Sequence, residues 1–98
     1  MKILALEIEL PGAEESAFRT LAKEEAARTW ELYQEGLIRE LYFRKDRPEA
    51  VLILECVGVE EAAKLLSTLP LVQMGLIDFE LIPLVAYPGF ARLFTASE

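Results

Sequence analysis

The amino-acid sequence predicts a single α+β domain whose elements follow the order β-α-β-β-α-β. Its 98 residues are too few for two independent hydrophobic cores. Hydrophobic residues make up 53% of the chain and charged residues 28%, a balance typical of compact globular domains. Segments with alternating apolar residues are separated by two segments in which apolar residues recur every three or four positions, so strands and helices are both expected.

The first part of the chain predicts a strand followed by a long amphipathic helix. Residues 3–10 alternate with the period of a strand, and Pro11-Gly12 ends it. From Ala13 to Gly36 the apolar spacing is helical. The expected packing face of this helix comprises Phe18, Leu21, Ala22, Ala26, Trp30 and Tyr33. We therefore assign Trp30 and Tyr33 to the core rather than to a ligand site.

The middle of the chain predicts a hairpin. Residues 37–44 are rich in Leu, Ile, Tyr and Phe, and residues 45–49 form a polar turn. Residues 50–57 are almost continuously apolar, as expected for a central strand buried on both faces, and Cys56 should belong to its core.

The last part predicts a short helix, a loop, a strand and a tail. The helix covers residues 59–69 and Pro70 stops it, a loop covers residues 71–76, the fourth strand covers residues 77–84, and residues 85–98 form an aromatic tail of the single domain 1–98. This order is the ferredoxin-like arrangement, an antiparallel four-stranded sheet with two helices on one face.

The sheet face away from the helices is expected to mediate self-association. We expect the helix side to carry Leu4, Leu6, Ile8, Leu52, Leu54, Cys56, Phe79 and Leu81. The opposite side then carries Ile3, Ala5, Glu7, Val51, Ile53, Glu55, Val57, Glu80 and Ile82. A half-apolar face of this size favours a homodimer or higher oligomer that joins sheet to sheet. The aromatic tail either reaches across the partner or packs on the edge of its own sheet.

Charge and composition exclude several functional classes. A net charge of −7 disfavours nucleic acid and anionic membranes as partners, and no apolar run approaches the length of a membrane span. The cytoplasm is the default location. With one cysteine and no histidine, the chain offers no common zinc site, and we expect no metal and no cofactor. It also lacks a Ser-His or Cys-His nucleophile pair and a phosphate-binding glycine loop.

Carboxylate chemistry remains, and it points to Glu7 and Glu55 as candidate catalytic residues. Both lie on the same expected face of neighbouring strands, where a shared apolar cavity would raise their pKa values and suit general acid–base work. The alternative is that each pairs with Arg39, Arg44 or an arginine of a partner chain, or reaches solvent at the rim of the sheet.

Three residues of the second strand are candidates for substrate binding. Tyr42, Arg44 and Glu40 share one parity, and they would supply an acid and an anion clamp for a small carboxylate substrate. Charge that protects an edge strand against aggregation explains Glu40 and Arg44 equally well.

Short motifs between residues 35 and 88 resemble muconolactone isomerases, members of the dimeric α+β barrel superfamily. They are the stretch Glu35–Tyr42, the buried strand ending near Glu55, Val59-Glu60 at the start of the second helix and Leu69-Pro70-Leu71 after it. The resemblance implies two sheets joined as a barrel. It also implies a cofactor-free isomerase that moves a proton on a small lactone-like or enolisable acid.

The sequence departs from that family at the positions where Trp, His and a polar residue are typical. Ile38, Glu40, Tyr42 and Ala50 stand there instead. Two alternatives therefore stay open: a non-catalytic module that binds a small molecule or only assembles, and an oxygenase of the same superfamily.

Overall fold

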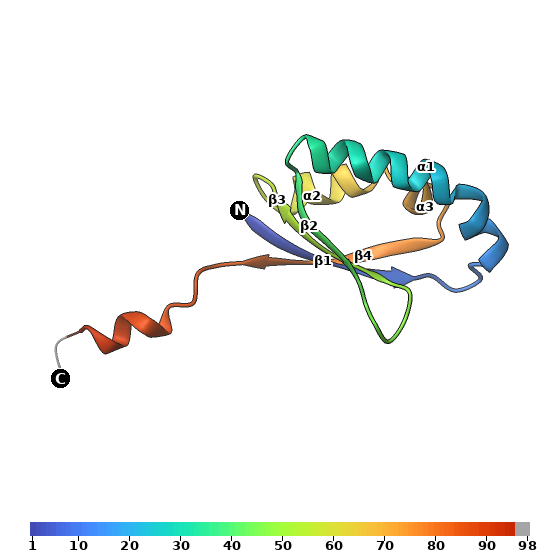
Figure 1. The fold of residues 1–98 in the computed structure, drawn as a ribbon. Helices are drawn as coiled ribbons and strands as arrows, with labels where there is room; N and C mark the ends of the chain where they lie inside the picture. The colour runs from blue at the N-terminus through green and yellow to red at the C-terminus, as the bar shows by residue number, and fades with distance from the viewer. Residues whose placement is uncertain (96–98) are drawn as a thin grey trace.

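The computed structural model describes residues 1–95, which form one antiparallel four-stranded sheet with the helices on one face (Figure 1). The strands are β1 (Lys2–Glu9), β2 (Ile38–Phe43), β3 (Ala50–Glu55) and β4 (Ile77–Leu84), in the spatial order β2-β3-β1-β4. The helices are α1 (Glu15–Gln34), α2 (Val59–Leu66) and α3 (Pro70–Gln73), and a 3₁₀ helix, η1, covers Gly89–Leu93. The predicted ferredoxin-like α+β fold is confirmed.

Glycines at two turns allow the chain to leave an element and reverse. Gly12 follows β1 and Gly36 follows α1, and their φ angles of 84° and 82° lie in the left-handed region that residues with a Cβ rarely adopt. The β2–β3 hairpin contains an irregularity between Ile38 and Glu40, where the pairing register shifts.

The segment after α2 differs from its prediction. The expected helix over residues 59–69 ends at Leu66, and the expected loop over residues 71–76 begins with the short helix α3. Pro70 stops the preceding helix but also starts this one, because its fixed φ and missing N–H suit the first helical position.

The core lies between the sheet and the helices, and it corrects the expected parity of β1. Ile3 and Ala5 are fully buried, and they pair with the buried Leu54 and Leu52 of β3. Directly opposed residues of an antiparallel pair share a face, so Ile3, Ala5 and Glu7 point toward the helices. The prediction that Leu4, Leu6 and Ile8 do so was wrong, whereas the predicted parity of Leu52, Leu54 and Cys56 is confirmed.

The inward face of α1 is also rotated from its prediction. Leu32 is 1% exposed, whereas Trp30 is 57% exposed and Tyr33 is 44% exposed. Assigning the two aromatic residues to the core was therefore wrong. They lie on the flank of the helix, because the less exposed stripe of α1 runs through Leu21, Glu25 and Leu32 instead.

The sheet face away from the helices, here called the outer face, is half apolar. Its residues are Leu4, Leu6, Ile8, Val51, Ile53, Ile82 and Leu84, interspersed with Lys2, Glu40, Tyr42, Glu55, Asp78 and Glu80. The expected half-apolar face is present, but β1 contributes a different set of residues to it than predicted. None of the helices in residues 1–95 covers this face (Figure 1).

The C-terminal segment projects away from the domain (Figure 1). The radius of gyration is 16.6 Å, against roughly 13 Å for a compact chain of this length. Tyr87, Phe90, Leu93 and Phe94 are each at least 68% exposed, and Tyr87 meets Phe90 edge to face at 5.1 Å. The described part of the tail, residues 85–95, thus does not pack on the edge of its own sheet, and residues 96–98 of the predicted tail lie outside the described part.

No helix in residues 1–95 combines the length and apolar character that crossing a membrane requires.

Candidate functional site

A large open pocket lies between α1, the inner face of the sheet and the β2–β3 hairpin. Its volume is about 1040 Å³, at the upper end of the range found for small-molecule sites. The lining residues are mostly apolar or aromatic, and they come from elements far apart in the sequence. The ones used below are Glu7, Glu9, Glu15, Glu25, Trp30, Tyr33, Leu41, Phe43, Ala50 and Phe79.

Glu7 enters this pocket from β1. The strand parity that buries Ile3 and Ala5 also directs Glu7 toward the helices. One carboxylate oxygen, Oε1, accepts a hydrogen bond from the backbone N–H of Ala50 at 3.0 Å. Burial raises the pKa of Glu7 and the Ala50 N–H opposes that shift, while the carboxylates of Glu49, Glu25 and Glu9 raise the pKa further. Glu7 is therefore a carboxyl group suited to exchange protons closer to neutral pH.

A second half-buried carboxyl group, Glu25, lines the pocket from α1. Its Oε1 accepts a hydrogen bond from the N–H of Leu71 at 2.9 Å, at the start of α3. Burial raises the pKa of Glu25, and the Leu71 N–H lowers it in part. Sequence reasoning missed this residue because hydrophobic spacing finds only apolar side chains. The available signal was its position four residues after Leu21 and seven before Leu32, on the less exposed stripe of the helix.

Aromatic side chains form one wall of the pocket. The rings of Trp30 and Tyr33 stack at a centroid distance of 5.7 Å with an interplanar angle of 29°. Leu41 and Phe43, on the edge strand β2, line the same space, and Phe43 is 70% exposed. These exposed apolar surfaces offer flat contacts to a ligand or to another protein segment.

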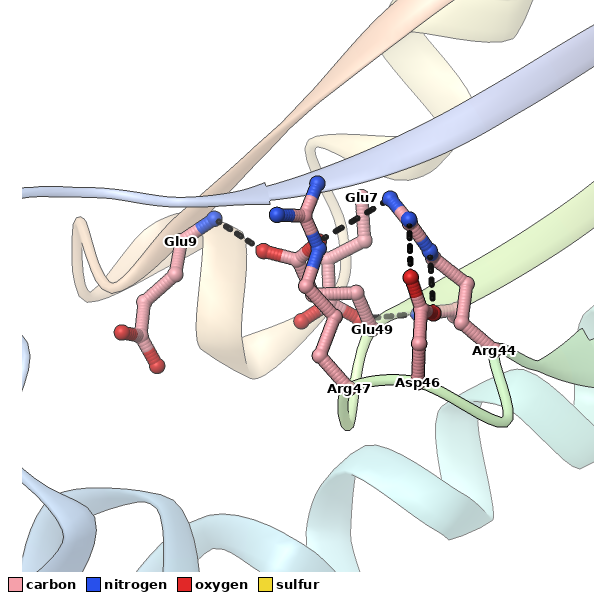
Figure 2. A network of polar contacts seen from close by, with 7 residues as sticks. Glu7, Glu9, Arg44, Asp46, Arg47 and Glu49 are labelled. Carbon is pink, nitrogen blue, oxygen red and sulfur yellow. Dashed lines mark hydrogen bonds and ion pairs between the residues drawn. The ribbon is translucent and has the colours of Figure 1, made fainter.

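The hairpin at the mouth of the pocket carries a network of charges (Figure 2). Glu49 Oε1 forms an ion pair with Arg47, whose Nε lies 2.7 Å away without hydrogen-bond geometry. Arg44 Nη1 lies 3.8 Å from the same oxygen. The other carboxylate oxygen of Glu49, Oε2, accepts a hydrogen bond from the backbone N–H of Glu9 at 3.4 Å. Glu49 thus ties the hairpin to β1 next to Glu7.

The structure separates the two predicted catalytic carboxylates. Glu55 lies opposite Lys2 in the β1–β3 ladder and shares the outer face with Ile53, whereas Glu7 lies on the helix side. Five residues of strand also part them, roughly 17 Å at 3.3 Å per residue. The prediction of a shared face was wrong because both parities of β1 are largely apolar, so that alternation alone could not orient the strand.

Glu55 is instead held in an ion pair. Its Oε2 lies 2.6 Å from the amino group of Met1, which also donates a hydrogen bond to the carbonyl of Cys56 at 2.7 Å. The hydrogen bond from the amino group lowers the pKa of Glu55. An ion pair was the alternative for this carboxylate, but its partner is the amino group of Met1 and not the expected arginine. Glu7 is thus the one member of the predicted pair that lines the pocket.

The three predicted substrate-binding residues do not form an anion clamp. Glu40 and Tyr42 pair with Ile53 and Val51, which places them on the outer face, and the Tyr42 hydroxyl donates to Glu40 at 2.7 Å. That hydrogen bond raises the pKa of Tyr42. Tyr42 is also among the residues that line the pocket. Arg44 donates two hydrogen bonds to Asp46, at 2.9 and 2.6 Å, and its guanidinium holds the pKa of Asp46 below the usual range.

Within residues 1–95, no group of three His, Cys, Asp or Glu side chains is placed to hold a metal ion. Cys56 is buried in the core, as predicted, and burial raises the pKa of its thiol.

Two solved structures are similar to this chain over nearly their whole length. Muconolactone isomerase is 22% identical with a TM-score of 0.73, covering 90% of this chain and 92% of its own. The 5-chloro-2-hydroxyhydroquinone dehydrochlorinase TftG from Burkholderia phenoliruptrix AC1100, in complex with 2,5-dihydroxybenzoquinone, is 18% identical with a TM-score of 0.63, covering 87% of this chain and 94% of its own. These likenesses confirm the fold that the sequence motifs predicted. Neither models of protein families nor curated proteins gave a match to the chain.

Proposed function

We propose that this chain is a cofactor-free enzyme of the muconolactone isomerase type, in which Glu7 moves a proton on a small lactone-like or enolisable molecule. The observation that carries the proposal is the half-buried carboxyl group of Glu7, with its raised pKa, inside a large pocket walled by apolar and aromatic side chains. The fold is shared with an isomerase and with a dehydrochlorinase solved with a small quinone, which supports the same class of ligand.

The proton transfer follows from the way Glu7 is held. The N–H of Ala50 fixes Oε1, so Oε2 is the oxygen that removes a proton from a carbon next to a carbonyl. The C–H electron pair moves into the carbonyl and gives an enolate. The protonated Glu7 then returns the proton to another carbon of the conjugated system, and the product is an isomer of the substrate. Tyr33, which lines the pocket, offers a hydroxyl donor for the enolate oxygen.

Proton exchange in D₂O tests this step without knowledge of the natural substrate. A panel of neutral lactones and cyclic ketones is incubated with the protein, and loss of the α-carbon proton signal is followed by NMR. We expect catalysed exchange with at least one compound, slowed about 100-fold or more in Glu7→Gln. The matched control is Glu80→Gln on the outer face, which should exchange at the wild-type rate.

Two results would refute the proposal. Exchange that survives Glu7→Gln would remove Glu7 from the reaction. Binding of the panel compounds without any catalysed exchange would instead favour the alternative, a non-catalytic module that binds small molecules.

We also propose that two copies associate through their outer faces, with the C-terminal segment crossing to the partner. The outer face exposes aliphatic side chains such as Ile8, which is 46% exposed, and the tail presents aromatic residues that meet little of their own domain. Light scattering of Ile53→Asp should give a smaller particle than the wild type. Deleting the residues after Pro88 tests the tail separately, since an unchanged mass would exclude its role in assembly.

A further inference from the structure

We propose that the substrate of this pocket carries no negative charge, so that the site selects neutral or cationic ring compounds against carboxylates. The inference rests on the proposed function for the location of the site and narrows its substrate class. It departs from the anionic substrate that an arginine clamp on the second strand would have implied.

The charges that line the pocket are all of one sign. Four carboxylates take part in the lining, those of Glu7, Glu9, Glu15 and Glu25. Among the described residues that line it there is no lysine or arginine, and the chain contains no histidine. An anion that enters therefore meets repulsion at a site whose apolar walls keep water from screening the charges fully.

The nearest arginines are already engaged outside the pocket. Arg44 forms its two short hydrogen bonds with Asp46, and Arg47 contacts Glu49. Figure 2 shows both guanidinium groups directed at these carboxylates on the hairpin. Turning Arg44 toward a ligand would break its pair with Asp46, and turning Arg47 would break its 2.7 Å contact with Glu49, a carboxylate whose charge acts on Glu7.

The remaining lining groups suit an uncharged or positively charged ring. The stacked Trp30 and Tyr33 present aromatic surface to which a flat ring binds, and a cation gains further from the ring electrons. Carboxylates accept hydrogen bonds but cannot donate them when ionised, so hydroxyl, amide or ammonium groups complement Glu7 and Glu25. Burial is the main cause of the raised pKa of Glu7, and the neighbouring carboxylates raise it further. A bound anion would meet the same carboxylate charges.

A matched series of three ligands isolates the effect of charge. Phenylacetate, phenylacetamide and phenethylamine share one ring and differ in carrying a negative, zero and positive charge. Trp30 is the only tryptophan in the chain and lines the pocket, so its fluorescence reports binding directly. At low ionic strength we expect the amide and the amine to bind at least about tenfold more tightly than the carboxylate.

Variants then assign the discrimination to the pocket. Glu7→Gln should lessen the penalty against phenylacetate severalfold, because it removes one charge and keeps an oxygen that can accept the Ala50 N–H. Glu80→Gln on the outer face removes the same charge at a distance and should leave the ratio unchanged.

Phenylacetate binding as tightly as phenylacetamide, or more tightly, would overturn the inference, and so would the absence of any Trp30 response to all three compounds at millimolar concentration. The inference would also be overturned if Glu7→Gln left the ratio of the phenylacetate and phenylacetamide Kd values unchanged. These outcomes are distinct from failure of the proposed function, which is decided by proton exchange in the Glu7→Gln protein.

Discussion

Removing the Glu25 side chain should destabilise the folded protein, because Glu25 accepts a backbone hydrogen bond at the start of α3. The proposed proton transfer does not use Glu25. Pro70 has no N–H, so Leu71 offers the first backbone donor of α3, and Glu25 Oε1 accepts it at 2.9 Å. In Glu25→Ala this donor loses its partner in a part-buried position. A hydrogen bond to a charged acceptor contributes about 1.5–3 kcal/mol, but the desolvated carboxylate that disappears offsets part of it.

The expected loss in free energy of unfolding is therefore about 1–2 kcal/mol, or roughly 4–16 °C in Tm for a domain of this size. Glu25→Gln keeps an oxygen acceptor and removes the charge, so it should stay within about 0.5 kcal/mol of the wild type. Glu24→Ala, at the exposed neighbouring position on α1, is the control and should also change stability by no more than about 0.5 kcal/mol.

Thermal unfolding followed by circular dichroism measures the three variants, and hydrogen exchange of the Leu71 amide locates the effect. Faster exchange at Leu71 is expected in Glu25→Ala alone. The reasoning is refuted if Glu25→Ala is no less stable than Glu24→Ala and the Leu71 amide keeps its protection.

Three further predictions concern the turn glycines, Glu7 and Cys56. Gly36→Ala should lower the free energy of unfolding, measured in urea, by about 1–2 kcal/mol, because the φ of Gly36 is positive. Gly58→Ala should lower it markedly less, because Gly58 has an extended φ of −170° and open space around it. Equal losses in the two variants would contradict this. Because burial raises the pKa of folded Glu7, its favourable contribution is complete below the unfolded value of about 4.3 and is lost as the pH rises through the folded pKa. The stability of the wild type relative to Glu7→Gln should therefore fall as the pH rises above about 4.3, and a constant difference would show that the group is not desolvated. Cys56 should react with a thiol reagent far more slowly in the native protein than in urea, and equal rates would mean that its strand is open to solvent.

The fold was predictable because most of its elements carry an unambiguous period. In β3 and β4 the residues predicted to face the helices do so: Leu52 and Leu54 are buried, and Phe79 is partly buried against the same core. In β1 both parities are apolar, and the choice is made by pairing with β3, where the small Ala5 faces the helices opposite Leu52. That information lies in the strand register rather than in the β1 sequence.

The site was only partly predictable for the same reason. Glu7 was identified as a candidate catalytic carboxylate, but it was placed on the outer face with Glu55, whereas it lies on the helix side. Glu25 sits on a helix stripe whose other members are apolar, and Trp30 and Tyr33 belong to the flank of α1 that the pocket leaves open. Periodicity assigns every large apolar residue to the core, so it cannot distinguish a packed aromatic side chain from one that is exposed in a pocket.

NMR mapping of bound phenylacetamide shows whether ligands enter the pocket between α1 and the sheet or bind to the outer face. We expect the largest shift changes at the Trp30 indole and at the amides of Ala50 and Thr29, which line the pocket. Changes centred on Ile53 and Ile82 would place the ligand on the outer face and refute the proposed site.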